Sequence, residues 1–144
     1  MRRLLSLTVL SGVLAGCAAV PPSDLSRVPE GEYKTSFGRL GLTAASGSGR
    51  VTGWYELDGG RLEGTYDDGV LRGTWVETSA TGTCRPRDLG YTMGGSTYYG
   101  TFTFVFNAER SRFEGTYAVC GGPEDDSWNG RRVSDPIDRG ALYF

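Results

Sequence analysis

Residues 50–78 read RVTGWYELDGGRLEGTYDDGVLRGTWVET, and this stretch repeats one five-residue pattern three times. Each copy runs from an apolar residue through a central glycine to an aromatic ring, as in Val51–Tyr55, Leu62–Tyr66 and Leu71–Trp75. Residues two apart in a strand share a face, so each copy sets a large residue, a glycine and a ring on one side. The intervening positions are mostly polar, and this alternation predicts half-buried antiparallel strands.

The links between these copies carry turn residues. Asp58-Gly59-Gly60 separates the first two copies, and Asp67-Asp68-Gly69 separates the next two. Asp-Gly supplies the positive φ angles that tight hairpins require. We therefore expect three consecutive strands to form a meander between about Arg50 and Thr78.

Two more copies of the pattern follow, at Tyr98–Phe102 and Phe113–Tyr117. The first belongs to a long strand predicted over residues 96–107, and the second to a strand over residues 112–119. Elsewhere, alternation predicts one bent strand or two over residues 31–43 with the bend at Gly38, a strand over 127–133 and a further one over 141–144.

Seven or eight short strands and no helical periodicity predict an all-β fold, a small antiparallel up-and-down β-barrel. Glycine normally weakens a strand, so its recurrence on the inward face needs a reason. Small residues between large ones let a tightly coiled sheet close, and rings from neighbouring strands can cover the bare backbone. The alternative is a glycine-lined binding surface.

The first residues have the pattern of a targeting segment. Arg2 and Arg3 precede the apolar stretch Leu4–Leu14, which is about half the ~20 residues that a membrane-spanning helix needs. Leu14-Ala15-Gly16-Cys17 resembles the lipobox of bacterial lipoproteins. This resemblance implies cleavage before Cys17, which would then carry a thioether-linked diacylglycerol and an amide-linked acyl chain. The alternative is a secreted protein cleaved elsewhere, with Cys17 incidental.

The lipobox predicts the organisation and location of the chain. Residues 1–16 would be the signal peptide, residues 17–29 a lipidated tether containing Pro21, Pro22 and Pro29, and residues 30–144 the barrel domain. The acyl chains on Cys17 would be the contact with the membrane. Because Ala18 is not the aspartate that retains many such lipoproteins in the inner membrane, the resemblance favours the outer membrane, facing the periplasm.

The remaining cysteines, Cys84 and Cys120, form an even pair in a compartment that oxidises thiols. A disulfide between them would close a loop of about 36 residues and stabilise the fold by roughly 3 to 4 kcal/mol. Two free thiols or a redox pair are the alternatives, although a catalytic pair usually has C-x-x-C spacing.

Composition narrows the possible functions. The chain has no histidine, which removes the usual catalytic triads and the commonest zinc and iron sites. With 15 basic against 17 acidic residues, there is no basic excess for binding nucleic acid. The acidic run Glu124-Asp125-Asp126 lacks the ligand spacing of known Ca²⁺ loops, so a solvated turn is expected there. We expect a protein that is not an enzyme, with no cofactor and no metal.

Three residues are candidates for binding a partner. Trp54 falls in the polar phase of its strand, where a large ring is often an interaction anchor, although other segments could cover it. Arg85 and Arg87 lie in the aperiodic stretch 78–95 and could grip a carboxylate or phosphate, or simply be solvated. These residues favour a binding module for a protein or envelope polymer.

Near the end of the chain, Trp128-Asn129-Gly130, followed by Arg132, adds a Trp-x-Gly sequence to the repeated glycine–aromatic pattern. This combination resembles the strands of avidin-like small barrels, but the biotin-contacting residues of that family cannot be matched one by one in this sequence. The size, anchor and single expected disulfide are also similar to small β-barrel lipoproteins that inhibit lysozyme. The alternatives are therefore a carrier of a small apolar ligand inside the barrel, or a lysozyme-inhibitor-like protein. Trp128 is expected to fill one end of the barrel, and Arg132, in the same phase, needs a buried partner or an opening to water.

Overall fold

The computed structural model describes residues 27–45, 47–84 and 98–134. Every strand pairing among them is antiparallel. The strands are β1 (Gly31–Thr35), β2 (Gly38–Ala44), β3 (Arg50–Tyr55), β4 (Gly60–Asp67), β5 (Val70–Glu77), β6 (Tyr98–Phe106), β7 (Arg112–Tyr117), β8 (Asp126–Ser127) and β9 (Gly130–Ser134), with a short 3₁₀ turn η1 (Leu57–Gly59).

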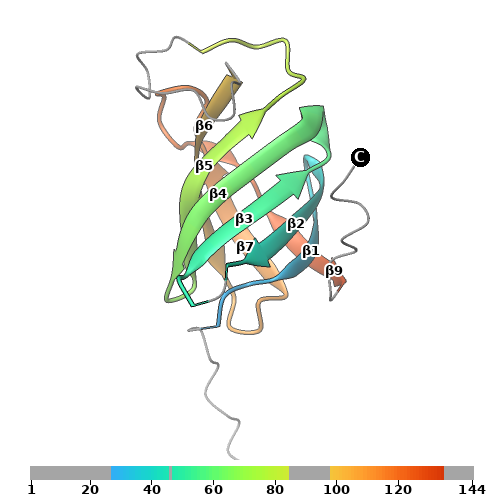
Figure 1. The fold of residues 1–144 in the computed structure, drawn as a ribbon, viewed down its shortest axis with the longest axis vertical. Coiled ribbons are helices and arrows are strands. Elements are labelled where there is room, and N and C mark those ends of the chain that lie inside the picture. The colour runs from blue at the N-terminus through green and yellow to red at the C-terminus, as the bar shows by residue number, and fades with distance from the viewer. Residues whose placement is uncertain (1–26, 46, 85–97, 135–144) are drawn as a thin grey trace, which may run out of the picture.

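The sheet closes on itself. Strands β1 to β7 pair in sequence, and β9 lies between β7 and β1, so eight strands form a barrel while β8 pairs only with β7 outside it. Figure 1 shows β3, β4 and β5 crossing the near side, with β6 and β7 behind them. The predicted small antiparallel β-barrel is confirmed.

The glycine pattern builds the barrel wall as expected. The apolar and aromatic ends of the copies in β3, β4 and β5 are all buried in one core cluster. Rings cover some glycines of neighbouring strands, because a Cβ at Gly100 would come within 2.7 Å of the Trp75 indole nitrogen and one at Gly130 would strike the Phe113 ring. At the central glycines of the copies in β3, β4 and β5, the nearest atom is instead a backbone carbonyl oxygen of a neighbouring strand. Glycine therefore makes room for rings at some positions and for close approach of two backbones at others.

The hairpin turns also follow the sequence prediction. Asp68 and Gly69 have φ angles of 41° and 86°, and they join Asp67 to Val70 as a two-residue turn. Asp58 and Gly59 likewise have positive φ angles. Residues 31–43 form two strands, which meet at Gly38 with a φ of 83°.

The prediction of one continuous strand over residues 127–133 is wrong. The chain leaves β8 after Ser127 and enters β9 at Gly130. Between them, the Trp128 backbone N–H donates to the Gly115 carbonyl at 2.8 Å, while the Asn129 side-chain oxygen accepts from the Gly115 N–H at 3.1 Å. Both bonds are made with one residue of β7, so the segment bends and turns Trp128 into the core, where it is 1% exposed.

One end of the barrel is closed by rings and arginine contacts. Tyr33 packs edge-on against Phe106 with the centroids 5.8 Å apart, and Tyr66 packs against the same ring at 6.0 Å. Arg132 lies over the Tyr33 ring and donates to the Glu30 carbonyl, so it has the partners that its inward phase required. The opposite end, which is uppermost in Figure 1, is built differently.

Candidate ligand-binding site

A cavity of about 380 Å³ lies at this opposite end, which we call the mouth of the barrel. It is within the range of about 300 to 1,000 Å³ that is usual for small-molecule sites. Side chains from the β1–β2 turn, η1 and the ends of β3, β5, β6 and β7 meet here. Its wall contains six aromatic residues: Phe37, Tyr55, Trp75, Tyr98, Tyr117 and Trp128.

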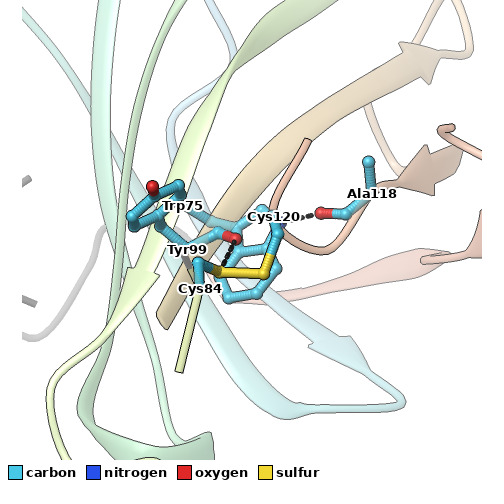
Figure 2. The surroundings of a disulfide bond; sticks show 5 residues. All are labelled: Trp75, Cys84, Tyr99, Ala118 and Cys120. Carbon is cyan, nitrogen blue, oxygen red and sulfur yellow. Dashed lines mark hydrogen bonds between the residues drawn. A yellow bond between two sulfur atoms is a disulfide. The ribbon is translucent and has the colours of Figure 1, made fainter. Parts of the chain in front are cut away.

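The repeated pattern places most of these rings. Tyr55, Trp75 and Tyr117 each end a copy, and Tyr98 begins one, so all four share the inward phase of their strands. Trp75 is fixed further, because its indole N–H donates to the Ala118 carbonyl at 3.1 Å (Figure 2). The barrel wall thus holds four of the six rings on strands.

The rings stand at steep angles to one another. Phe37 and Tyr55 each pack against Trp128 with centroids 4.9 Å apart, at interplanar angles of 82° and 78°. Trp75 meets Tyr98 at 71° and Tyr117 at 70°. Edge-to-face contacts of this kind are favourable and leave ring walls facing in several directions.

Glu77, the last residue of β5, brings a carboxylate into this aromatic surrounding and is only 8% exposed. Its Oε1 accepts a hydrogen bond from the Tyr55 hydroxyl at 3.2 Å. Burial raises the pKa of the Glu77 carboxyl above its ordinary value; the Tyr55 hydrogen bond works against this rise and the charge of Asp58 adds to it. Burial and the charge of Glu77 together raise the pKa of Tyr55, which therefore stays protonated and donates.

Asp58 of η1 is the second charged residue among the described lining. Burial is the main cause that raises the pKa of the Tyr98 hydroxyl, and the charges of Glu77 and Asp58 raise it further. The same two charges act on Tyr55. The described part of the cavity is therefore an aromatic surface under a negative potential.

Trp128 also lines the cavity. Its Nε1 is inaccessible to solvent and has no hydrogen-bond partner among the residues that the structure describes. Leaving a buried donor without an acceptor costs about 1 to 3 kcal/mol, and the packing of the ring has to offset this cost.

The predicted disulfide between Cys84 and Cys120 is present, with the Cα atoms 5.3 Å apart. Figure 2 shows it beside Tyr99. The Tyr99 carbonyl also accepts a 2.7 Å hydrogen bond from the Cys120 N–H. The bond joins the segment after β5 to the segment after β7, and both segments line the cavity, through Gly82 and Val119. It therefore ties down two sides of the mouth.

The three candidate partner-binding residues lie elsewhere. Trp54 is half-buried on the outer face of β3, opposite Gly41, and a Cβ at Gly41 would strike its indole ring. It does not line the cavity. Arg85 and Arg87, like the strand expected at 141–144, fall outside the described residues.

Sequence reasoning missed Glu77, Asp58 and Phe37. For Glu77 a signal was available, because Leu71, Gly73, Trp75 and Glu77 alternate along β5 and an acid in this inward phase is unusual. Phe37 and Asp58 lie in turns, where strand periodicity says nothing about the direction of a side chain.

No group of three or more acidic, histidine or cysteine side chains in the described parts of the chain is arranged to hold a metal ion. Within the same residues, no helix has the length and apolar character needed to cross a membrane. Comparison of the chain with protein-family models, with curated proteins and with solved structures finds no match.

Proposed function

We propose that this protein is a lipid-anchored binding protein of the cell envelope that takes a small ligand into the mouth of its barrel and catalyses no reaction. The observation that carries the proposal is the 380 Å³ cavity, because four of its six rings belong to strands of the barrel wall and polar side chains are set among them. Aromatic walls with placed polar groups are typical of small-molecule sites.

The cavity favours a small ligand over a large partner because it is concave and is lined by inward-facing side chains. The rest of the interior is filled by buried residues such as Phe102, Phe104 and Leu71, so the ligand would occupy the mouth and not the barrel axis. Glu77 and the Tyr55 hydroxyl make an amphipathic ligand a better match than a purely apolar one.

Binding without catalysis is the simplest use of this site. The chain has no histidine, and the buried carboxylate is engaged by a tyrosine hydroxyl that stays protonated. Such a pair can orient a ligand through hydrogen bonds without transferring a proton. The role of the anchor would be to keep this site at the membrane.

The ligand site can be tested with a neutral, polarity-sensitive naphthylamine dye and a pair of Thr→Trp variants. Thr81 is exposed and lines the cavity, so Thr81→Trp places an indole at its rim. Thr52→Trp adds the same indole at an exposed position of β3 that does not line it. We expect saturable dye binding that Thr81→Trp weakens and Thr52→Trp leaves unchanged. Equal binding by the two variants, or none by the parent, would overturn the proposal.

The anchor is tested separately by metabolic labelling with an alkyne-bearing fatty acid. The lipobox Leu14-Ala15-Gly16-Cys17 supports incorporation of label into the parent chain and its loss in Cys17→Ala. Equal labelling of the two proteins would refute lipidation at Cys17. Fractionation of the envelope would then test the outer-membrane location in the same strains.

A further inference from the structure

The two charged side chains in the described lining of the mouth cavity are both acidic. Glu77 is almost fully buried at the end of β5, and Asp58 lies at the rim in η1. A neutral ligand can only hydrogen-bond to the two carboxylates, whereas a positively charged one is in addition attracted by the charge of both. Charge therefore distinguishes among the ligands that the cavity could hold.

The aromatic walls point to the same ligand chemistry. The faces of tryptophan, tyrosine and phenylalanine rings attract cations, and ammonium groups with apolar substituents lose little hydration on entering such a surrounding. In the wall of the mouth, Trp128 meets Phe37 and Tyr55, and Trp75 meets Tyr98 and Tyr117, at interplanar angles of 70° or more. A cation in the cavity can contact more than one of these inclined rings.

The electrostatic potential within the cavity agrees with this geometry. Burial is the largest cause of the raised pKa values of Tyr55, Tyr98 and Tyr117, and the charge of Glu77 raises all three further, for Tyr117 after the larger effect of Asp126. The negative charge that adds to the cost of a tyrosinate in this place attracts a cation.

We propose that the ligand of the mouth cavity is a small organic ammonium ion, held against the aromatic walls and facing the carboxylates of Glu77 and Asp58. This inference rests on the proposed ligand site and adds the chemical class of the ligand. A protonated or quaternary amine could come from a free solute or from a lipid headgroup, and both present the same chemistry to the cavity.

The test compares choline with 3,3-dimethyl-1-butanol, which has the same shape but carries carbon in place of the charged nitrogen. The full-length chain is purified in a non-ionic detergent, and binding is measured by calorimetry and by quenching of tryptophan fluorescence. We expect choline to bind roughly tenfold or more tightly than the neutral probe. Equal affinity for the two probes would overturn the ammonium inference.

Variants that remove one negative charge test whether Glu77 attracts choline. Glu77→Gln keeps the shape of the side chain and removes its charge, so it should reduce choline affinity by roughly tenfold and leave the affinity for the neutral probe unchanged. Glu114→Gln, at an exposed carboxylate of β7 that does not line the mouth, is the matched control and should change neither. If Glu77→Gln does not fold, Asp58→Asn at the exposed rim supplies the charge test, with a smaller loss expected.

The outcomes separate the two proposals. Saturable binding of the neutral dye without preference for choline would sink the ammonium inference and leave the ligand site intact. Failure of dye and choline alike would sink both. Vesicles of phosphatidylcholine and of phosphatidylglycerol distinguish the two sources of the ammonium group. Binding to phosphatidylcholine vesicles alone, competed by free choline, indicates a lipid headgroup. Binding of free choline without binding to either kind of vesicle indicates a free solute.

Discussion

Gly64 of β4 and Gly73 of β5 lie directly opposite each other in the barrel wall, and neither has space for a side chain. A Cβ at Gly73 would strike the Glu63 carbonyl oxygen and come within 2.6 Å of the Gly64 Cα. These obstacles are backbone atoms, which cannot rotate away. The pair lets two strands approach closely at a point where the sheet curves.

Gly73→Ala is therefore expected to destabilise the barrel by about 1 to 3 kcal/mol, the usual cost of adding a methyl group to a filled space. Gly122→Ala is the control, because its nearest obstacle is the Val119 carbonyl at 3.1 Å in a turn. Urea unfolding of both variants measures the difference. The same unfolding midpoint for Gly73→Ala and the parent would contradict the packing argument.

The disulfide is expected to stabilise the fold by closing a loop of 36 residues. Replacing Cys84 and Cys120 together by alanine should lower the free energy of unfolding by roughly 3 to 4 kcal/mol. Urea unfolding with and without a reductant checks this: the reductant should destabilise the parent and have no further effect on the double variant. A parent that is insensitive to complete reduction would show that the bond adds no stability.

Two tryptophans offer a matched test of the Trp75 hydrogen bond. Trp75→Phe deprives the buried Ala118 carbonyl of its donor, which should cost about 1 to 3 kcal/mol in addition to the lost ring area. Trp54→Phe removes an indole whose Nε1 has no hydrogen-bond partner among the described residues, so its cost should be smaller. Thermal unfolding compares the two. A larger destabilisation by Trp54→Phe would argue against the role assigned to the Ala118 contact.

Local pattern was enough to predict most of the fold. The alternation and the Asp-Gly turns of residues 50–78 depend only on neighbours in sequence, and β3, β4 and β5 form within that stretch. The break between β8 and β9 was not predictable in this way. It depends on Gly115, which bonds both Trp128 and Asn129 from another strand.

The candidate site was less accessible to sequence reasoning because it depends on barrel closure. The alternation of inward and outward residues along β5 would have placed Glu77 inside the barrel. Its hydrogen bond with Tyr55, however, forms only because the ends of β3 and β5 lie at the same end of the closed barrel. A turn residue such as Phe37 is not part of any strand alternation, so its direction could not be predicted. The Cys84–Cys120 bond, by contrast, was predictable from counting, since the resemblance of Cys17 to a lipidated residue left one even pair.

Glu77 should make the stability of the fold depend on pH. Burial raises its pKa in the folded chain above the ordinary value of 4.5 that applies when the chain is unfolded. The folded state then holds the proton more tightly, so the stabilising contribution is complete below pH 4.5 and is lost as the pH rises through the folded pKa. Glu77→Gln should lack this decline. The free energy of unfolding, measured with urea from below pH 4.5 upward, tests this prediction, and the control variant Glu114→Gln should follow the parent. Superimposable pH profiles of Glu77→Gln and the parent would show that Glu77 is not the group responsible.

Tyr55→Phe should deepen this dependence. The Tyr55 hydroxyl donates to the Glu77 carboxylate, and this bond holds the pKa of Glu77 below the level that burial alone would set. Without the donor, the buried carboxylate loses a partner, at a cost of about 1 to 3 kcal/mol when it is ionised. The cost should shrink as falling pH protonates Glu77, because a neutral carboxyl no longer needs the donor in the same way. A double-mutant cycle with Glu77→Gln isolates the pair: the effect of Tyr55→Phe should lose its pH dependence in that background, and a dependence that persisted there would have to come from another titrating group.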